Sequence, residues 1–483
     1  MPGAWIMEEL KTADLKDKRL DRRLHEVLAQ LSERPTASIP AACGGHAERT
    51  GAYRLFDNPK ASFGEILRPH GDATVLRLSA QAVGLLVQDT TEVEPVWPQL
   101  QVAGTGPLDG SRRGALMHLL HAFTPDGTPL GTLEGRAWAR PEAAEQTPPT
   151  CARRAIPIEQ KESFRWVQTV RGAGALAAAC PQTHMVYLAD SEADIYEVLE
   201  EGAALGAGID WIVRGCYDRA LASEAGREAG AEHVLEHLES QAVLFEKTVQ
   251  IRARSKKVPC DQRGRRQPRT SRKARLSVRA AGGIVLRSPW RPKRRPAGVT
   301  INAVLVREVN PPGGEEPVAW LLLTSLPVST AQQVRLVIQY YWVRWMIEVF
   351  FRVLKTGCRV EQRRFEHMDR LLSCLAVFLI VAWRTLYVCR LGRSCPQVSC
   401  EAVFEPAEWQ SVWQVVRETA PPAAPPRLGK MVGFVAQLGG YVKGKRRGPP
   451  GPQTIWLGLQ RMQDFARCWR LFGPAARAGP KDV

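Results

Sequence analysis

Two aspartates stand where apolar segments of the chain end. Asp89 follows the apolar run 83–88, within the tetrapeptide QDTT at 88–91, and Asp190 follows the apolar run 185–189. Strand ends in α/β sheets border the crevice in which ligands bind, so these carboxylates are placed to share a site. Each also has a structural interpretation, because Asp commonly caps the turn or helix that follows it. Neither aspartate alone therefore identifies a catalytic site.

A third carboxylate lies in the segment YWVRWMIEVFFRVLK, inside residues 329–358, which we expect to form one long helix. Four functional side chains recur there at spacings that place them on one side of a helix: Tyr341, Arg344, Glu348 and Lys355. The alternative is an amphipathic helix with an Arg344–Glu348 ion pair, worth only a few tenths of a kcal/mol. That alternative accounts for the pair but not for the two matching aspartates.

Three carboxylates without a supporting Cys or His cluster suit Mg²⁺ or Mn²⁺, which prefer oxygen ligands and keep open positions for water and phosphate. Two such ions about 4 Å apart activate the attacking oxygen and stabilise the leaving oxygen of an in-line displacement at phosphorus. Arg344 and Lys355 then serve as phosphate clamps. We therefore predict phosphoryl transfer on DNA, with three residues both catalytic and metal-binding: Asp89, Asp190 and Glu348.

The charge of the chain also points to a polyanionic partner. Its 483 residues carry a formal net charge of +17, and clustered Lys and Arg gain affinity by releasing counterions from phosphates.

We expect no membrane partner, because the most apolar run, 371–383, is short of the roughly 20 residues that span a bilayer and has the pattern of a buried helix. The N-terminus reaches charged residues before an apolar signal core could form, so we expect a cytoplasmic protein. The 11 cysteines are scattered without a CxxC pair, and we expect reduced core residues.

The carboxylates must be positioned by a sheet. Three short β-like segments in meander order are expected at 83–88, 115–124 and 131–139. A helix near 157–178, a strand at 185–189, a helix at 192–203 and a strand at 211–214 should follow. The order βββαβαβ predicts an α/β sheet over about 70–225.

An unusual basic segment follows the sheet. Residues 247–295 hold 18 Lys plus Arg and a single acidic residue, Asp261, and their apolar residues alternate at strand-like spacing. Further strands at 303–306 and 320–323 complete an expected β-rich insertion at about 235–325. The rest of the chain should be mainly helical, beginning with a helix at 366–393.

The N-terminal segment 14–33 has the pattern of an amphipathic basic helix. Leucine and valine residues repeat on one helical face, and five basic residues crowd the same segment. A DNA-binding helix and an ordinary solvated packing helix are both consistent with this pattern alone.

Taken together, these motifs resemble the bacterial DDE insertion-sequence transposases of the cut-and-paste type, in the IS-four family and similar to the Tn-five transposase. The resemblance rests on three motifs: the signature from Tyr341 to Lys355, QDTT at 88–91, and DSEAD at 190–194. Further landmarks cover essentially the whole chain: GAYRLFDNP at 51–59, KESFRW at 161–166, WLLLTS at 320–325, EQRRFE at 361–366 and LGGY at 438–441.

The resemblance implies a ribonuclease-H-like catalytic core with a β-rich insertion, flanked by helical domains. Residues 1–70 would form a helical DNA-end-binding domain, 71–365 the catalytic domain, and 366–483 a helical dimerisation domain. The implied partners are double-stranded DNA, both terminal inverted repeats and target, and a second copy in a synaptic homodimer. The implied location is the bacterial cytoplasm, in association with the nucleoid.

The resemblance also assigns roles to residues. Two Mg²⁺ or Mn²⁺ ions per site would be held by the carboxylate trio, and Tyr341, Arg344 and Lys355 would contact phosphates of the DNA end. Trp320 would stack on a flipped base, and Arg214 would assist a hairpin step. Weaker candidates are Thr90 for phosphate and three residues for DNA-end binding: Arg22, Arg23 and Arg54.

The implied mechanism has four steps at one site: a nick by water, a hairpin formed by the freed 3′-hydroxyl, reopening by water, and strand transfer. Ser191 departs from the family, where an Arg commonly follows the second Asp. Glu192 and Asp194 sit at an expected helix start, which favours a capping role. Two other functions are weighed: a catalytically silent inhibitor of transposition, which the intact trio disfavours, and a metal-dependent repair nuclease, which would cut without joining.

Overall fold

The computed structural model describes residues 3–96, 102–142, 156–222, 232–254, 268–289, 298–444 and 448–474. The chain forms two compact units. The first unit combines Met1–Gln146 with Trp345–Val483, and the second is Thr147–Arg344. The domain limits expected from the sequence remain predictions.

The first unit contains the expected antiparallel meander. Its strands are β1 (Val83–Val93), β3 (Arg113–Phe123) and β4 (Pro129–Trp138), and a short β2 (Gly106–Pro107) pairs with the start of β3. β3 pairs with β1 on one side and with β4 on the other. The register sets Asp89 opposite Leu119 and Thr90 opposite His118. The three-strand prediction is confirmed, and β1 extends beyond its apolar run to include Asp89.

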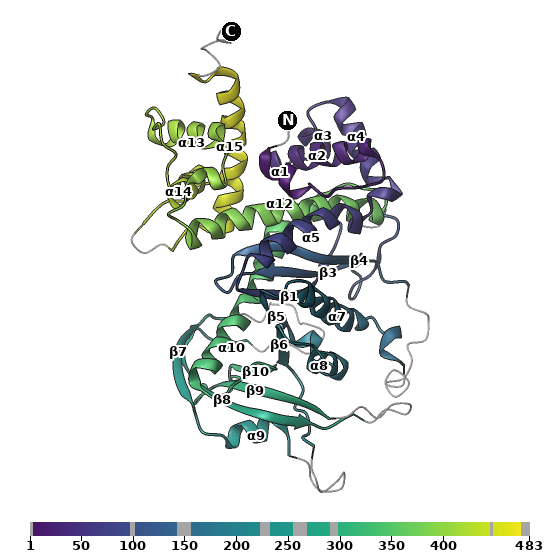
Figure 1. The fold of residues 1–483 in the computed structure, drawn as a ribbon, viewed down its shortest axis with the longest axis vertical. Helices are drawn as coiled ribbons and strands as arrows, with labels where there is room; N and C mark the ends of the chain where they lie inside the picture. Colours follow the sequence, from purple (N-terminus) through teal and green to yellow (C-terminus); the bar gives the residue numbers. More distant parts are fainter. Residues whose placement is uncertain are drawn as a thin grey trace. The chain divides into compact units, whose positions relative to one another are not determined.

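Two long helices cover this meander (Figure 1). α5 (Phe63–Ser79) packs on β4, and α12 (Met368–Ser394) packs on both α5 and β4. The apolar run expected to be too short for a membrane is therefore part of a longer helix, which has the length and composition of a membrane span. Its apolar window is 89% buried inside the protein, so it is packed as a core helix, as the sequence predicts.

Short helices form the N-terminal part of the first unit. The expected basic helix is α2 (Lys18–Glu33), which begins at Lys18 because the Asp17 side chain accepts a hydrogen bond from the N–H of Arg19. Its leucine and valine face is buried, as the periodicity predicts. The neighbouring helices are α1 (Ala4–Glu9), α3 (Ile39–Ala42) and α4 (His46–Phe56).

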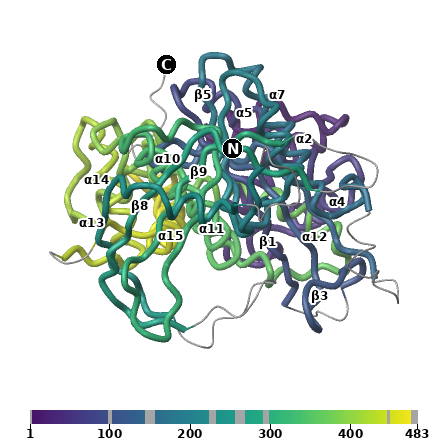
Figure 2. The backbone as a smooth tube through the Cα atoms, turned by 90° about the horizontal axis from the view of Figure 1, so that it is seen from below, coloured from purple at the N-terminus to yellow at the C-terminus, as the bar shows by residue number. Residues whose placement is uncertain are grey.

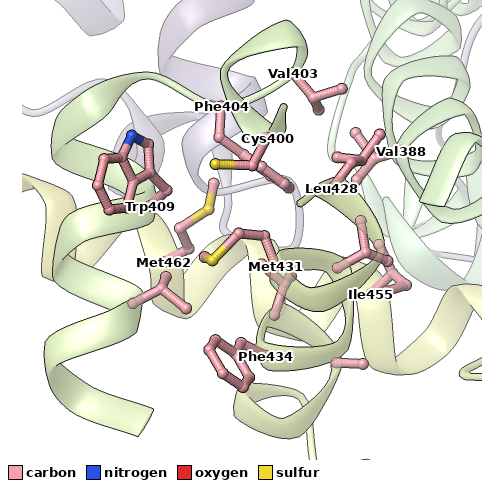
Figure 3. Packing of buried hydrophobic residues seen from close by; sticks show 14 of the residues in the cluster. Val388, Cys400, Val403, Phe404, Trp409, Leu428, Met431, Phe434, Ile455 and Met462 are labelled. Carbon is pink, nitrogen blue, oxygen red and sulfur yellow. The ribbon is translucent and has the colours of Figure 1, made fainter. Parts of the chain in front are cut away.

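Three further helices close the C-terminal part of the first unit, and Figure 2 shows them gathered in one region. They are α13 (Pro406–Arg417), α14 (Leu428–Leu438) and α15 (Pro452–Phe472). Their apolar side chains form one cluster with the end of α12, in which Trp409, Met431, Ile455 and Met462 are buried (Figure 3). This confirms the helical C-terminal region.

The second unit carries the other strands in the order β5-β6-β10-β9-β8-β7. β5 and β6 are parallel and are joined through α8, while the remaining pairs are antiparallel. α7 packs on β5 and β6, and α9 packs on β8 and β9. The bounds are β5 (His184–Ala189), β6 (Ile209–Gly215), β7 (Phe245–Ile251), β8 (Arg272–Leu286), β9 (Val299–Glu308), β10 (Ala319–Thr324), α7 (Phe164–Ala179), α8 (Tyr196–Ala203) and α9 (Val234–Ser240).

The strands expected in the basic segment are thus present. Of 247–295, residues 255–267 and 290–295, which include Asp261, lie outside the described residues. The mixed α/β class with helical ends is confirmed.

The single long helix expected at 329–358 is wrong. The chain forms α10 (Ala331–Val343), α11 (Trp345–Arg352) and a π-helical turn, η5 (Val353–Gly357). Arg344 keeps helical torsion angles, but its N–H bonds the carbonyl of Tyr341, three residues back, at 3.1 Å. Such tightening and such π turns mark departures from regular α-helix that propensity does not reveal.

Short turns complete the secondary structure: η1 (Pro59–Ala61), η3 (Ile158–Gln160), η4 (Ser191–Ala193), η6 (Val360–Gln362) and η7 (Cys400–Ala402). The cysteine prediction is correct only in part. All described cysteines are free thiols, but Cys216, Cys395 and Cys468 are exposed rather than in the core. Cys151 and Cys260 lie outside the described residues.

Candidate active site

Asp89 lies where β1 leaves the core. The strand is fully buried over 84–88 and half-buried over 89–92, because the apolar run ends at Gln88. One carboxylate oxygen of Asp89 accepts the N–H of Thr90 at 2.8 Å. The carboxylate thus lies at the boundary between core and solvent, but Asp89 stands inside β1 rather than at the strand end that the sequence predicts.

A buried histidine supports this strand from β3. His118 is 2% exposed, and its Nδ1 lies 2.7 Å from the hydroxyl oxygen of Thr90. Its Nε2 contacts the side-chain amide of Gln88. One neutral tautomer satisfies both contacts, with Nδ1–H donating to Thr90 and Nε2 accepting from Gln88. The two residues that flank Asp89 are therefore held by one imidazole.

The sequence interpretation missed His118. Its place on the meander was visible, but the register that sets it opposite Thr90 is a property of the folded sheet. Thr90, predicted as a phosphate-binding candidate, has its hydroxyl in this contact.

Glu348 belongs to the first unit as well. It is half-buried on α11, a helix that contacts β1. Lys355 follows in the π-helical turn and pairs with Glu361 at 3.3 Å. The same oxygen of Glu361 accepts the N–H of Glu94 at 3.2 Å. The ammonium of Lys355, which is predicted to clamp phosphate, therefore pairs with the carboxylate of Glu361, and a backbone N–H orients that carboxylate.

In the second unit, Asp190 follows the buried strand β5. Its carboxylate accepts the N–H of Glu192 at 2.8 Å and caps the turn η4, so the capping interpretation of this residue also holds. Burial raises the pKa of the neighbouring Tyr187 well above its usual range, and the negative charge of Asp190 adds to that effect. Asp190 thus lies half-exposed at the end of an apolar strand, as predicted.

Aromatic and cationic side chains gather around Tyr341, on whose phenol the charge of Asp190 also acts. The rings of Trp320 and Tyr341 meet edge to face at 6.0 Å, and the guanidinium carbon of Arg344 lies 5.9 Å from the Tyr341 ring centroid. Burial raises the pKa of Tyr341, and the charges of Arg344, Arg214 and Asp190 all act on it. Four predicted residues are therefore brought together around Tyr341: Asp190, Arg214, Trp320 and Arg344.

The hydroxyl of Tyr341 is a buried polar atom that makes no hydrogen bond of acceptable geometry to any of the described residues. Arg344 lies close enough to lower the pKa of this phenol through a side-chain contact, but the contact does not meet hydrogen-bond geometry. Buried hydroxyls normally have a partner, so this atom is suited to a ligand oxygen.

Asp194 has a different role from the capping predicted for it. It is fully buried, and its carboxylate accepts the N–H groups of Cys216 and Tyr217 together with the Arg219 guanidinium, at 2.5 to 3.1 Å. It therefore ties the turn after Asp190 to the chain that leaves β6. Glu192 instead pairs with Arg165 at 3.3 Å.

The predicted end-binding arginines lie on α2 and α4. Arg22 and Arg23 both pair with Glu26, at 3.7 and 2.9 Å. The Arg22 side chain is 73% exposed and that of Arg23 only 27%, because Arg23 packs over Gly51. Arg54, in the last turn of α4, is exposed. Arg22 and Arg54 are thus accessible, whereas Arg23 packs between helices.

Metal binding fits the chemistry of the predicted ligands. Asp89, Asp190 and Glu348 offer oxygen atoms only, and the first two are oriented by backbone N–H bonds. Such donors suit hard divalent cations. Asp89 and Glu348 belong to the first unit and Asp190 to the second. Over the described ranges, no three His, Cys, Asp or Glu residues are grouped closely enough to hold a metal ion.

Three family models match the chain, and together they cover most of it. A transposase DNA-binding model matches residues 2–61, a transposase DDE domain model matches 151–382, and a transposase Tn5 dimerisation domain model matches 380–476. Asp190, Glu348 and the signature residues lie within the second match, and Asp89 lies before it.

Among solved structures, a cryo-EM synaptic complex of piggyBac transposase with hairpin DNA aligns with 97% of this chain and 77% of that chain. The identity is 10% and the TM-score 0.37. A likeness at this level assigns no function to individual residues.

Proposed function

Because the chain belongs to the Tn5-like DDE transposases, enzymes that cleave and rejoin DNA, we propose that it moves its element by cut-and-paste transposition. The DDE family uses divalent metal ions, and the matched models entail DNA binding and dimer formation. The proposal adds the order of steps, the residues that perform them, and the DNA ends on which they act.

Each step breaks one P–O ester bond as the attacking oxygen forms a new P–O bond, so water leaves a terminal phosphate and a 3′-hydroxyl leaves a new ester. Water attacks the scissile phosphate and releases a 3′-hydroxyl. That hydroxyl attacks a phosphate of the opposite strand, so one P–O bond forms, one breaks, and a hairpin end results. Water then reopens the hairpin, and the same 3′-hydroxyl attacks target DNA. Every step is a displacement at phosphorus, so the protein must position the attacking oxygen and stabilise the negative charge that develops on the phosphate.

The carboxylates of Asp89, Asp190 and Glu348 would hold two Mg²⁺ ions, with Mn²⁺ as a substitute. When bound, such ions activate the attacking oxygen and neutralise charge on the leaving oxygen. The contacts of His118 with Gln88 and Thr90 would keep Asp89 in position while DNA enters and leaves.

The observation that carries the proposal is the group of side chains around Tyr341. Among the described residues the buried Tyr341 hydroxyl has no hydrogen-bond partner, and two guanidinium groups, an indole and the carboxylate of Asp190 lie around that tyrosine. The hydroxyl and Arg344 would bind phosphate oxygens of the DNA end. Trp320 would stack on a base turned out of the helix, and Arg214 would assist the hairpin step. Lys355 would exchange Glu361 for phosphate on binding DNA.

Terminal inverted repeats of the element are the proposed DNA ends, read by the N-terminal helices that carry Arg22, Arg23 and Arg54. We further propose that dimerisation places each active site on the end bound by the other subunit, and that the enzyme works in the cytoplasm. Mixing an Arg22→Ala/Arg54→Ala variant with an Asp89→Ala variant tests the subunit arrangement. Restored cleavage supports action across the dimer, whereas a mixture that cleaves no ends contradicts it.

The central experiment incubates the protein and Mg²⁺ with a fragment bearing the element's own ends. Wild type should yield nicked, hairpin-ended and joined products, and Glu348→Gln should bind the ends without cutting them. Glu65→Gln serves as the control, because Glu65 is a 51% exposed carboxylate on α5. A wild type that binds but never cuts would be an inhibitor, and one that cuts without joining would be a nuclease.

A further inference from the structure

Helix α10 and strand β7 share a face on which two cations lie over two aromatic rings. The Lys247 ammonium is 5.0 Å from the centroid of the Trp342 ring, and the Arg335 guanidinium carbon is 3.9 Å from that of Phe245. Figure 1 shows α10 beside β7. These four residues are called the α10–β7 face.

This face is accessible to a partner. Trp342 is 50% exposed, and both cations are exposed. A large aromatic residue that served only to pack a helix on a strand would be buried, because burial is what stabilises such packing. Leu336, on the next position of α10, is also 40% exposed. The face therefore offers solvent an indole ring edged by cations.

Among the described residues, no carboxylate pairs with the cations of the face. α10 contains no acidic residue. The one acidic residue of β7, Glu246, lies on the opposite side of the strand from Phe245 and Lys247 and pairs with Arg275 at 3.7 Å. In the described parts of the chain, the ion pairs include neither Lys247 nor Arg335. Two cations that no described carboxylate neutralises favour an anionic ligand.

The spacing of the face matches a duplex. Arg335 and Trp342 are seven residues apart on one helix, about 10 Å at 1.5 Å per residue. A DNA duplex advances about 3.4 Å along its axis per base pair, so the two cation–aromatic pairs span about three base-pair steps along that axis.

We infer that the α10–β7 face binds double-stranded DNA through its sugar–phosphate backbone, without selecting sequence. Lys247 and Arg335 contact phosphates, and the exposed ring of Trp342 packs on deoxyribose. Contacts of this kind position DNA but do not read bases, which suits a target duplex rather than a terminal repeat. The inference rests on the proposed function for its choice of DNA.

The test measures binding of full-length protein to a random-sequence duplex over a range of salt concentrations. Lys247→Ala and Arg335→Ala should each weaken binding several-fold and lower the slope of log K against log [salt] by about 1. Trp342→Ala should weaken binding without changing the slope, because it removes no charge. Lys247→Gln and Arg335→Gln repeat the test with less loss of packing, should an alanine variant fail to fold.

Two variants serve as matched controls. Arg171 lies 5.9 Å from the Phe164 ring centroid in the same unit, and Lys430 lies 4.2 Å from that of Trp413 on the C-terminal helices. Arg171→Ala and Lys430→Ala each remove one cation from an aromatic ring elsewhere and should leave binding near the wild-type value. Equal losses in face and control variants would overturn the inference, as would equal losses for a random duplex and for polyglutamate.

Strand transfer separates this inference from the proposed function. Variants of the face should cleave element ends normally but join them to target poorly. If wild type binds random duplex through the α10–β7 face yet never cuts DNA, the proposed function is contradicted and the inferred DNA-binding surface is supported. If wild type cuts and joins while the face variants match the controls, only the surface fails.

Discussion

The imidazole of His118 holds the hydroxyl of Thr90 at 2.7 Å, one residue along β1 from Asp89. This contact joins two neighbouring strands of the meander at the position where a metal ligand is proposed. It makes His118 a positioning residue, because the imidazole touches the neighbours of Asp89.

Replacement of His118 by Phe should therefore weaken catalysis more than folding. We expect cleavage to fall about 10- to 100-fold, the usual effect of losing a group that orients a metal ligand. The Mg²⁺ concentration for half-maximal cleavage should rise, which a purely structural role would not cause. His118→Asn, which can still donate to Thr90, should recover part of the loss. An unchanged Mg²⁺ requirement in His118→Phe would contradict the positioning role.

Tyr341→Phe removes a buried hydroxyl that has no hydrogen-bond partner. Its loss should leave the free energy of unfolding unchanged or slightly higher, because no hydrogen bond is broken. Cleavage should fall about 10- to 100-fold if the hydroxyl binds phosphate, since a hydrogen bond to a charged group contributes about 1.5 to 3 kcal/mol. Denaturant unfolding and cleavage assays, with Tyr340→Phe as control, separate the two effects. Lower stability with normal cleavage would assign the hydroxyl a structural role.

Acid should destabilise the first unit through a buried group between α1 and α5. The Nδ1–H of His70 donates to Glu9, and the His70 Nε2 accepts the N–H of Thr132 at 2.9 Å, so the ring is neutral. Burial lowers the pKa of His70. Burial alone would raise the pKa of Glu9, but His70 and Arg77 outweigh burial and lower it.

Both shifts have the same sign in their effect on stability. The His70 contribution is complete above its ordinary pKa of 6.5 and is lost as pH falls toward the lowered value in the folded protein. The Glu9 contribution is complete above 4.5 and is lost at still lower pH. The protection of α5 amides against hydrogen exchange, corrected for the intrinsic exchange rate, should fall as the pH drops below 6.5 in wild type. The His70→Asn variant should show a smaller change, and an identical change in both would exclude His70 as the cause.

Gly458 allows α15 to approach α14. A β-carbon at this position would overlap the carbonyl oxygen of Val435, and no side-chain movement relieves a clash with backbone. Gly458→Ala should lower the free energy of unfolding by about 1 to 3 kcal/mol and weaken dimer formation. Gly433→Ala is the control, because Gly433 on α14 faces open space and alanine there should stabilise by about 0.5 to 1 kcal/mol. Equal melting temperatures for the two variants would contradict the close approach.

Much of this architecture follows from local pattern. Local pattern predicts the apolar runs before Asp89 and Asp190, the meander and the basic strands. The reason is that the alternation of a strand depends on residues that are neighbours in the sequence. The family signature likewise lies within one continuous segment. The carboxylate trio and its metals stay predictions, because Asp89 and Glu348 belong to one compact unit and Asp190 belongs to the other.

Tertiary structure decided what depends on residues far apart in the chain. The register that sets His118 against Thr90 is fixed by packing on both faces of β1 and β3, and the burial of Tyr341 needs Trp320 from another strand. The sequence predicts a capping role for Asp194. In the structure its buried carboxylate instead accepts hydrogen bonds from Arg219 and from the backbone N–H groups of Cys216 and Tyr217. The break at Arg344 likewise escaped propensity, because local sequence specifies helix on both sides of it. Periodicity reports which side of an element is buried, and only the fold supplies the partner.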